Sequence, residues 1–538
     1  MEDRAVQILV TAYSSLLNKV NIVINKKIAL RSAIVAASIL PSLAMASGYK
    51  LNEQSAAGMG TAHAGRAAMA DDASVVFYNP AAMTELDRAQ LTAGFTYIKG
   101  HGEFTGNATN AGGFDITGAD DSDPYSDGGN YLGESFIPFF YYARPINEKL
   151  SVGLGVFTPF GTKTNYEDDF VGGGFADETS LISLEIAPTF AYKVNEQLSI
   201  GGGLDIVYME GLLSKFVDTV PYSAQLAGLY AQTEAAGGDG DAALKNQGLA
   251  QGENSPLIDS TNAGFENHYE VKGDDWGIGW NFAAYYELSE KTTLGFTYRS
   301  EIEFELEGDS KFDGADTFYV YSQANDAKVP VGALLGTAQT SIAPQASKVP
   351  LTTPASATLA VTHQFNDELL LQAGATWTGW SSFQSFDVIA TEDTAGLADG
   401  VAHISDISEL NGLEDGYIGH IDERWVDVWA VAFGGTYQLS DKLALRAGYA
   451  YDQSPVRDEY RTARVPSSDR QWVTLGAGYT VNQDLSFDVA AGYLFMYPMD
   501  LNEVNKDLDN NPTSSKASVT GEYEIDVFGL SAQVNYKF

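Results

Sequence analysis

The chain is 538 residues long, carries 31 Lys and Arg against 71 Asp and Glu, and contains no cysteine. The absence of cysteine excludes a disulfide framework, Cys-ligated zinc, iron–sulfur clusters and thiol catalysis. A net charge of -40 is the opposite of the basic surface that nucleic-acid binding requires, so no nucleic-acid partner is expected. The 54 glycines and 12% aromatic residues recur to the end of the chain, which is typical of a large all-β protein.

The first 46 residues differ in composition from the rest of the chain. Basic residues precede an apolar run over residues 34–40, and Ala44-Met45-Ala46 has the small-residue pattern of a signal-peptide cleavage site. The run is shorter than the roughly 20 residues that span a bilayer. Residues 1–46 are therefore predicted to be a secretory signal peptide. No later stretch is apolar for as long as about 18 residues, so the exported chain is predicted to be either soluble or a β-barrel.

Six polar triplets divide the chain beyond residue 88 into seven pieces. Each triplet is flanked by segments in which apolar and polar residues alternate, so each is predicted to be a tight hairpin turn. Each piece is long enough for two strands and a longer loop, which gives an even number of strands, fourteen, as single-chain bacterial barrels require. The triplets occupy residues 147–149, 195–197, 289–291, 366–368, 440–442 and 482–484.

Alternation with a period of two predicts which side chains face lipid and which face the lumen. In the last predicted strand, Phe528, Leu530 and Tyr536 alternate with Ser531 and Asn535. A soluble sandwich would also alternate, but with shorter strands and fewer glycines on its polar face. The predicted fold class is all-β, a fourteen-stranded antiparallel transmembrane barrel. It is expected to span residues 89–538, with extracellular loops at about residues 214–272, 309–349 and 392–420.

Residues 47–88 fit neither a strand nor a loop, because they are rich in Gly, Ala and Met and show no alternation. A barrel of fourteen strands has a lumen wider than side chains fill, since about eight strands is the filled limit. These residues are therefore predicted to plug the barrel.

The chain resembles the long-chain fatty-acid outer-membrane transporter (FadL) family. Gly48-Tyr49-Lys50-Leu51, Asn79-Pro80-Ala81 and Trp276-Gly277-Ile278-Gly279-Trp280 are among the motifs that carry the resemblance. They follow one another in family order along nearly the whole mature chain, which is more specific than any single motif. The motifs lie at residues 48–53, 58–60, 70–73, 79–81, 276–281, 286–288, 297–301, 380–383, 452–456 and 465–470.

The resemblance implies a fourteen-stranded barrel with an N-terminal hatch over residues 47–88. It implies passive uptake of hydrophobic substrates, which are captured between extracellular loops and then enter a luminal pocket touched by the N-terminus. Release then follows sideways into the membrane, at an inward kink in the third strand. Tyr49 matches the aromatic residue that inserts in the pocket, and Asn79 and Pro80 match a hatch element near the ligand. The alternatives are a disordered terminus for Tyr49 and an ordinary Asn-Pro turn.

The third predicted strand, which ends at Thr158, runs into Pro159, Phe160 and Gly161. Proline cannot donate to a ladder and glycine permits irregular backbone angles, so strand pairing is expected to break here. The alternative is a strand that ends at its loop. The resemblance favours a kink that acts as a lateral gate at Pro159, Phe160 and Gly161, with Thr158 and Phe160 in contact with substrate.

A fatty-acid carboxylate buried in an apolar lumen needs a cation. Lys215, at the end of the fifth predicted strand, matches a basic pocket residue of the family, with Lys in place of Arg. Ile421 stands at about the position of a second basic residue, so His420 and Arg424 are the candidate replacements. The alternative is that these charges pair only with luminal carboxylates.

The function predicted is passive transport of long-chain fatty acids across the outer membrane, and the runner-up is uptake of neutral compounds such as aromatic hydrocarbons. A diffusion porin, which would pass small sugars, and an outer-membrane lipase are the alternatives from other classes. No G-x-S-x-G or H-E-x-x-H motif is present, so an enzyme, a cofactor and a metal site are not expected. The expected partners are the hydrophobic substrate, outer-membrane lipid and lipopolysaccharide, and the protein is expected to be a monomer because its path needs no second subunit.

Overall fold

The computed structural model describes residues 48–109, 125–217, 267–312, 319–322, 327–330, 341–391, 401–402, 404–405, 413–414, 416–512 and 517–538. The predicted signal peptide and most of the predicted extracellular loops lie outside the described residues. Within the described ranges, no helix is long and apolar enough to cross a membrane.

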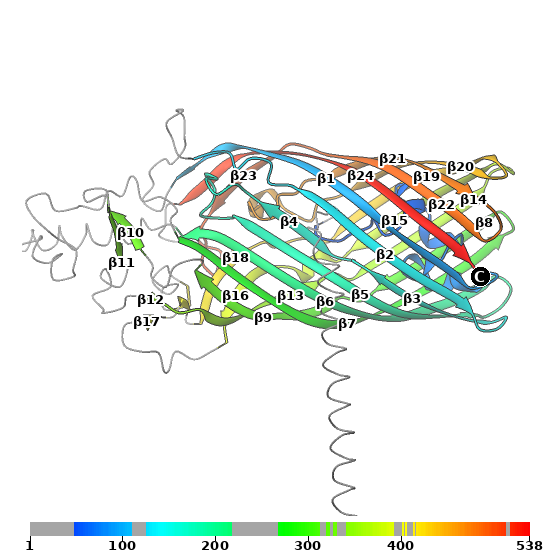
Figure 1. Cartoon of the computed structure of the whole chain (residues 1–538), viewed down its shortest axis with the longest axis horizontal. Helices are drawn as coiled ribbons and strands as arrows, with labels where there is room; N and C mark the ends of the chain where they lie inside the picture. The colour runs from blue at the N-terminus through cyan, green and yellow to red at the C-terminus, as the bar shows by residue number, and fades with distance from the viewer. Residues whose placement is uncertain are drawn as a thin grey trace, which may run out of the picture. The chain divides into compact units, whose positions relative to one another are not determined.

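Antiparallel strands close into a barrel (Figure 1). The first strand, β1 (Gln90–Thr109), pairs over its whole length with the last, β24 (Ser518–Lys537), so the sheet has no free end. Closure removes the exposed edges that an open sheet presents to other chains. In the described part of the chain, twenty strand segments belong to this sheet, and six strands are each interrupted once, which leaves fourteen strands. The predicted fold class is confirmed.

The remaining strands follow in chain order, and segments joined by "with" form one barrel strand. They are β2 (Glu134–Pro145), β3 (Leu150–Phe157) with β4 (Gly161–Asn165), β5 (Glu178–Lys193), β6 (Leu198–Val217), β7 (Asn267–Ser289), β8 (Thr292–Arg299) with β9 (Ile302–Phe312), β13 (Gln345–Thr353) with β14 (Ser356–Gln364), β15 (Leu369–Thr378) with β16 (Ser385–Ala390), β18 (Tyr417–Asp422) with β19 (Val428–Ser440), β20 (Leu443–Asp452), β21 (Arg470–Thr480), and β22 (Leu485–Met496) with β23 (Met499–Val504). Two short pairs lie outside this sheet, namely β10 (Tyr319–Ser322) with β11 (Ala327–Pro330) and β12 (Ser341–Ile342) with β17 (Val401–Ala402).

The six predicted hairpin turns all join consecutive strands, and an asparagine closes four of them. Asn147 Oδ1 accepts hydrogen bonds from the backbone N–H groups of Lys149 and Leu150 at 2.9 and 3.0 Å. A side-chain acceptor of this kind stabilises a tight turn by taking the place of a backbone acceptor. The same arrangement occurs at Asn195, Asn366 and Asn482. The predicted loops were a few residues too wide, because the strands around them continue beyond the apolar band.

The outward face of the barrel is apolar. Phe528 and Leu530 are 41% and 45% exposed, whereas Ser531 and Gln533 of the same strand are buried. An exposed apolar band around a closed barrel is the surface that lipid covers. Similar outward residues occur around the ring, among them Phe95, Leu154, Leu204, Ile278, Leu359, Phe433, Leu475 and Val489.

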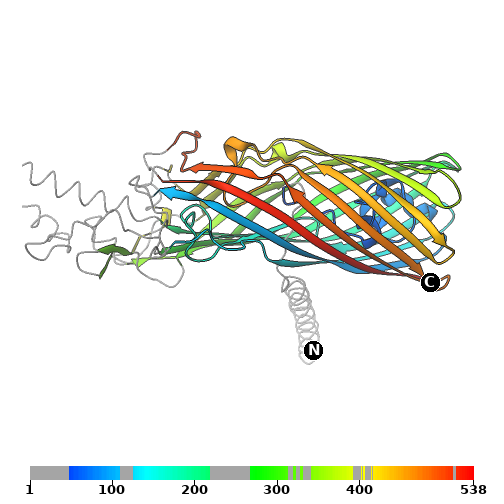
Figure 2. The ribbon, with the colours of Figure 1, turned by 90° about the horizontal axis from the view of Figure 1, so that it is seen from above.

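Residues 48–88, called here the N-terminal segment, lie inside the ring of strands (Figure 2). The segment forms four short helices, α2 (Ala56–Met59), η1 (Arg66–Ala68), α3 (Val75–Tyr78) and η2 (Pro80–Glu85). They hydrogen-bond to or pack against β1, β6, β7, β22 and β24, among other strands.

Glycines in the strands make room for the backbone of this segment. A Cβ atom at Gly295 of β8 would lie 1.8 Å from the carbonyl oxygen of Ala67, and one at Gly448 of β20 would lie 2.1 Å from the carbonyl carbon of Thr61. Glycine in a strand interior weakens the strand and is found where another backbone approaches closely. These glycines therefore adapt the lumen to its contents.

Candidate functional site

The third barrel strand is interrupted between Phe157, where β3 ends, and Gly161, where β4 begins. The three residues 158–160 face only two residues of β5, Ser183 and Leu184. An extra residue on one strand is a β-bulge, which bends the strand and increases its twist. The Ser183 hydroxyl completes the bulge, because it accepts from the Phe160 N–H at 2.9 Å and donates to the Phe160 carbonyl at 2.6 Å.

The opposite edge of this strand loses its neighbour at the same place. β3 pairs with β2 only as far as Val156, opposite Phe140. Within the described strands no pairing joins β2 to β4, and the next contact is a hydrogen bond of 2.9 Å from the Asn165 N–H to the Tyr131 carbonyl. Between these two points the barrel wall lacks a backbone ladder, at the position of Pro159.

The N-terminal segment pairs with the interrupted stretch from inside the lumen. The Leu51 N–H donates to the Pro159 carbonyl at 2.8 Å, and the Gly161 N–H donates to the Tyr49 carbonyl at 2.8 Å. These bonds flank an isolated antiparallel bridge. Backbone groups buried away from water need partners, and here the chain's own N-terminal residues supply them in place of β2.

The Tyr49 ring is buried in an aromatic cluster. Its centroid lies 4.6 Å from that of Trp380, 5.7 Å from those of Phe383 and Trp425, and 6.0 Å from that of Phe160. Three of these contacts are edge-to-face, the arrangement that aromatic quadrupoles favour. Tyr49 therefore joins the interrupted strand to residues far along the chain.

Tyr49 also lines an apolar pocket of about 30 Å³. This volume is well below that of a cavity of roughly 150 Å³ that holds one benzene molecule. A larger ligand therefore has to displace one of the lining side chains. The apolar lining residues include Leu181, Leu213, Val271, Leu306, Val349, Leu351, Phe386 and Val465.

A second cavity, of about 60 Å³, is lined by charged side chains. It adjoins the apolar pocket, because Leu213 and Val465 line the pocket whereas Lys215 and Arg464 line the cavity. Arg464 is buried, and its Nη1 donates to the Ser214 carbonyl at 2.9 Å. Lys215 thus lies among other cations. The further cationic side chains that line the cavity are Arg461 and Lys506.

The carboxyl groups of Asp422, Glu459 and Glu503 line the same cavity, and Glu423 lies near Arg464. Burial raises the pKa of Glu423 to about 8 and the pKa of Glu503 to about 7. Both groups lie beyond the apolar band, since the nearby outward side chains of Asp427 and Asn502 are polar and exposed. When these carboxyl groups are protonated, they do not neutralise the positive charge of Arg464 and its neighbours.

Arg424 is not among the residues that line this cavity. Its side chain is 38% exposed, its Nε donates to Asp422 Oδ1 at 3.0 Å, and its guanidinium lies 5.3 Å from the centre of the Tyr460 ring. His420 does line the cavity, with Nδ1 2.6 Å from Asp387 Oδ1. Arg464, which the sequence analysis did not name, lines the cavity together with Lys215. The one signal was its position directly before the 465–470 motif.

Asn79 and Pro80 lie elsewhere, where the N-terminal segment meets the strands β6 and β7. Asn79 Nδ2 donates to the Ala284 carbonyl of β7 at 3.0 Å, and Asn79 Oδ1 accepts from the Ala81 N–H at 3.0 Å. Asn79 therefore caps η2, and Pro80 occupies the first turn of that helix, where proline is tolerated. Neither residue lines the apolar pocket or the second cavity.

Arg299 of β8 connects the N-terminal segment to the end of β3. Its Nη1 lies 2.9 Å from Glu185 Oε1 and 3.1 Å from Asp205 Oδ2. Its guanidinium also lies 4.9 Å from the centre of the Phe77 ring and 5.6 Å from that of Phe157. A cation held over aromatic faces in this way adds a further attraction between the two elements.

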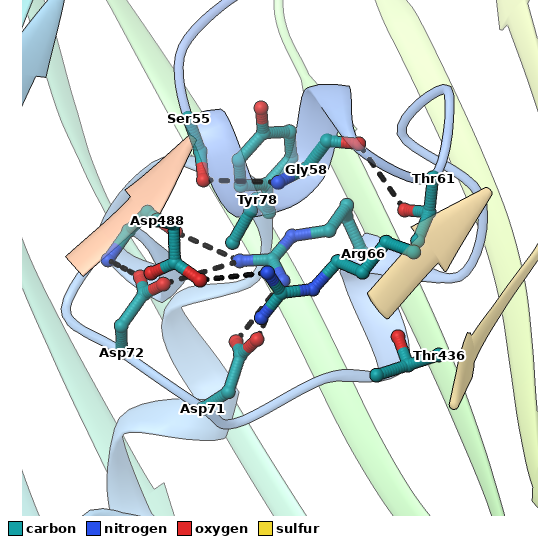
Figure 3. A network of polar contacts seen from close by, with 12 residues as sticks. Ser55, Gly58, Thr61, Arg66, Asp71, Asp72, Tyr78, Thr436 and Asp488 are labelled. Carbon is teal, nitrogen blue, oxygen red and sulfur yellow. Dashed lines mark hydrogen bonds and ion pairs between the residues drawn. The ribbon is translucent and has the colours of Figure 1, made fainter. Parts of the chain in front are cut away.

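A buried polar network holds the opposite side of the N-terminal segment. Figure 3 shows Asp71 and Asp72 beside the guanidinium of Arg66, with Asp488 close by. Arg66 Nη1 donates to both carboxylate oxygens of Asp71 at 3.0 and 2.9 Å, and its Nη2 donates to Ser74 Oγ at 2.9 Å. These hydrogen bonds to a charged group are stronger than neutral ones.

Gln533 of β24 joins this network to the barrel wall. Its Oε1 accepts from Ser55 Oγ at 2.9 Å and from the Ala56 N–H at 2.7 Å, and its Nε2 donates to Asp72 Oδ2 at 3.0 Å. Nε2 also lies 3.2 Å from Asp488 Oδ2 of β22. Asp488 in turn accepts from Arg446 Nη1 and from Asn535 Nδ2, each at 2.7 Å.

Comparison with known proteins gives matches over nearly the whole chain. The family model described as "Outer membrane protein transport protein (OMPP1/FadL/TodX)" matches residues 37–538. The long-chain fatty acid transport protein of Escherichia coli O6:H1 is 28% identical over 466 residues, which is 86% of this chain and 89% of that protein. Outer membrane protein P1 of Haemophilus influenzae is 28% identical, over 92% of this chain and 96% of that protein.

Solved structures share the fold. The crystal structure of a Pseudomonas aeruginosa FadL homologue has a TM-score of 0.71 at 25% identity, over 91% of this chain and 100% of that one. The Ralstonia pickettii toluene transporter TbuX has a TM-score of 0.55 at 16% identity, over 90% of this chain and 99% of that one, and shares the fold alone.

Proposed function

Because the chain belongs to the outer membrane protein transport protein family (OMPP1/FadL/TodX), we propose that it carries long-chain fatty acids passively across the outer membrane. Its location in the outer membrane follows from the family and from the closed barrel. The apolar band would contact outer-membrane lipid and lipopolysaccharide. The path lies within one barrel, so a monomer suffices.

The observation that carries the proposal is the apolar pocket beside a charged cavity, which is lined by four cations and by the carboxyl groups of Asp422, Glu459 and Glu503. A long-chain fatty acid combines an apolar chain with one carboxylate, and burying that carboxylate without a cation costs several kcal/mol. Leu213 and Val465 line the first site, and Lys215 and Arg464, which lie two residues and one residue away from them in the chain, line the second. An amphiphile could therefore place its chain and its head group in adjoining sites.

The size of the apolar pocket suggests how binding leads to release. A ligand that enters a pocket of about 30 Å³ has to displace a lining group, and the Tyr49 ring is the one carried by the N-terminal segment. Leaving the Pro159 carbonyl and the Gly161 N–H without partners would cost about 2–6 kcal/mol in total. Burying about three to eight methylene groups at ~0.8 kcal/mol each offsets that cost, and a long-chain fatty acid has more.

Release would then follow through the wall beside the interrupted strand. Once Tyr49 leaves, Pro159 and Gly161 lose their inner backbone partners, whereas the Thr158 carbonyl keeps its hydrogen bond from Gln54 Nε2, and β2 does not pair there. Pro159, Phe160 and Gly161 would act as a lateral gate that opens into the membrane. Thr158 and Phe160 would contact the passing chain, while Asn79 and Pro80 belong to the hatch formed by residues 47–88.

Uptake of a neutral hydrocarbon by the same barrel is the second candidate, because the lining of the apolar pocket needs no charged ligand. Charge removal separates the two candidates. We expect Lys215→Met to weaken oleate uptake about tenfold in cells that produce the variant and to leave toluene uptake unchanged. Lys149→Met, in an exposed turn, is the control. Equal loss of both substrates would contradict a carboxylate site at Lys215.

A further inference from the structure

Three buried polar atoms of the charged cavity have no hydrogen-bond partner among the residues that the structure describes. They are Nε of Arg464, Nε2 of His420 and Oδ2 of Asp422. Their side chains are more than nine-tenths buried, with 3%, 7% and 6% exposed. A buried polar atom without a partner costs free energy, so three of them in one binding cavity favour a ligand that supplies the partners.

Neighbouring side chains hold the two groups on β18 in place. His420 Nδ1 lies 2.6 Å from Asp387 Oδ1, and the two residues face each other in the pairing of β16 with β18. Asp422 Oδ1 accepts from Arg424 Nε at 3.0 Å. Because a carboxylate only accepts, Nδ1 of His420 carries a proton. Each residue therefore bonds to the protein through one polar atom and has the other left for a ligand.

The free donor comes from a different part of the barrel. Arg464 Nη1 donates to the Ser214 carbonyl at 2.9 Å, which places the guanidinium at the end of β6, next to Lys215. Its Nε–H can only donate, so its partner has to be an acceptor. The carboxylate of a fatty acid meets this requirement, and the charge of the guanidinium strengthens the bond.

Asp422 Oδ2 makes the opposite demand, because an ionised carboxylate accepts and needs a donor. A second carboxylate oxygen would be repelled there, and a cationic donor is disfavoured by Arg461 and Lys506, which line the same cavity. A neutral hydroxyl group meets the demand. Its oxygen can also accept from His420 Nε2 when that ring is protonated, and with a neutral ring the hydroxyl can donate to either residue.

The volume of the cavity limits the distance between the two groups of the ligand. Its size of about 60 Å³ is less than half of the roughly 150 Å³ that holds one benzene molecule. The cavity has room for a small polar head group, while the apolar chain extends into the adjoining pocket. The hydroxyl therefore has to lie close to the carboxylate on the ligand.

We propose that the substrate is a long-chain fatty acid with a hydroxyl group on its α- or β-carbon, and that His420 and Asp422 are specificity-determining residues that bind this hydroxyl. This inference rests on the proposed function and names the substrate class within it. The carboxylate lies beside Lys215 and Arg464, and the hydroxyl lies beside β18. A fatty acid without the hydroxyl binds in the same place but leaves both groups on β18 without partners.

Equilibrium binding to the detergent-purified protein at one pH tests the inference. The readout is the fluorescence of Trp380 and Trp425, which both contact Tyr49. Palmitate is compared with its α-, β- and ω-hydroxy derivatives, and the ω-derivative controls for added polarity because its hydroxyl lies at the far end of the chain. We expect the α- or the β-hydroxy acid to bind about tenfold more tightly than palmitate, and the ω-hydroxy acid to show no such gain.

Two variants remove the groups on β18 one at a time. His420→Asn keeps an amide N–H near the position of Nδ1 for Asp387 and removes Nε2. Asp422→Ala removes Oδ2, and its partner Arg424 is partly exposed to solvent. In both variants we expect the affinity for the hydroxy acid to exceed that for palmitate by less than about threefold. This ratio does not depend on the lost charge, because both ligands carry one carboxylate.

Asp500→Ala is the matched control, because it removes an exposed carboxylate of β23 that does not line the cavity. It should keep the full preference for the hydroxy acid. Binding of palmitate by each variant shows that its barrel is folded and its pocket intact.

Equal affinities of the unmodified protein for palmitate and for the α- and β-hydroxy acids would overturn the inference and leave the fatty-acid proposal standing. A preference that survives in both His420→Asn and Asp422→Ala would also overturn it, because the hydroxyl would then bind elsewhere. Binding of toluene without binding of any of the acids would overturn the proposed function, and the inference with it.

Discussion

The N-terminal segment meets the barrel in two chemically different ways. Toward β20, β22 and β24 the contact consists of buried charges and amide side chains, as with Arg66, Asp488 and Gln533. At strand three it consists of main-chain pairing between Tyr49 and Gly161 and of aromatic rings. A buried network of charges is very costly when some of its members lose their partners. The few hydrogen bonds of a short backbone ladder and the contacts of one ring cost less to lose, so a ligand can replace them. The first kind of contact suits a fixed anchor and the second a reversible one.

The largest effect is expected from filling a glycine on the anchored side. The Cβ atom of Gly295→Leu would lie 1.8 Å from the Ala67 carbonyl oxygen, a backbone atom, so η1 must leave the wall. Overpacking of this kind typically costs about 1–3 kcal/mol or more. We expect single-channel conductance in planar bilayers to rise at least tenfold as the lumen opens to ions.

Gly374→Ala is the matched control, because its Cβ atom would meet its nearest neighbour at an ordinary 3.5 Å. Equal conductance of Gly295→Leu and the unmodified protein would show that the segment does not seal the lumen. High conductance of the unmodified protein would favour a diffusion porin instead.

A smaller effect is expected from removing the central charge of the anchor. Arg66→Met removes a buried cation from beside half-buried Asp71 and buried Asp72, and breaking a fully buried pair costs about 3–5 kcal/mol. Amide hydrogen exchange of residues 55–72 in detergent should speed up by a factor on the order of 100 to 1,000. Arg88→Met, which removes a partly exposed pair with Asp484, should change exchange little. Unchanged protection of this stretch in Arg66→Met would argue against an electrostatic anchor.

The smallest effect is expected in the pH dependence of oleate binding. Below pH 7 the carboxyl groups of Glu503 and Glu423 are largely protonated, and above pH 8 both are charged, because their pKa values are raised to about 7 and about 8. The added negative charge weakens the binding of an anion beside Arg464 by about 1 kcal/mol. Oleate affinity should therefore fall about fivefold between pH 6 and pH 9.

Oleyl alcohol, which carries no charge, should bind with an affinity that does not change over this range. Glu503→Gln should flatten part of the oleate profile. An oleate affinity that rises with pH would place the carboxylate away from this cavity.

The sequence predicted those features that depend on neighbouring residues. The turn at Asn147 and the outward position of Phe528 follow from local patterns, and the structure confirms both. The break in pairing at Pro159 follows from the missing N–H of proline. Each of these predictions needs only a few consecutive residues.

The contacts that the sequence analysis missed join residues far apart in the chain. Arg464 reaches Ser214, which is 250 positions away, and Gln533 reaches Asp72, 461 positions away. Its closeness to Ile421 in sequence makes Arg424 a candidate for the basic residue of the pocket. In the structure its backbone has a φ of +41° and its side chain bonds to Asp422. Periodicity assigns a residue to a face of the barrel and does not tell which residues of that face meet across the lumen.

Equilibrium binding of oleate to the detergent-purified protein tests the central claim most directly. Trp380 and Trp425 both contact Tyr49, so their fluorescence should report the displacement of that ring. The account predicts saturable oleate binding in the micromolar range, which toluene does not displace. Toluene binding without oleate binding would contradict it, because the charged cavity would then have no part in recognition.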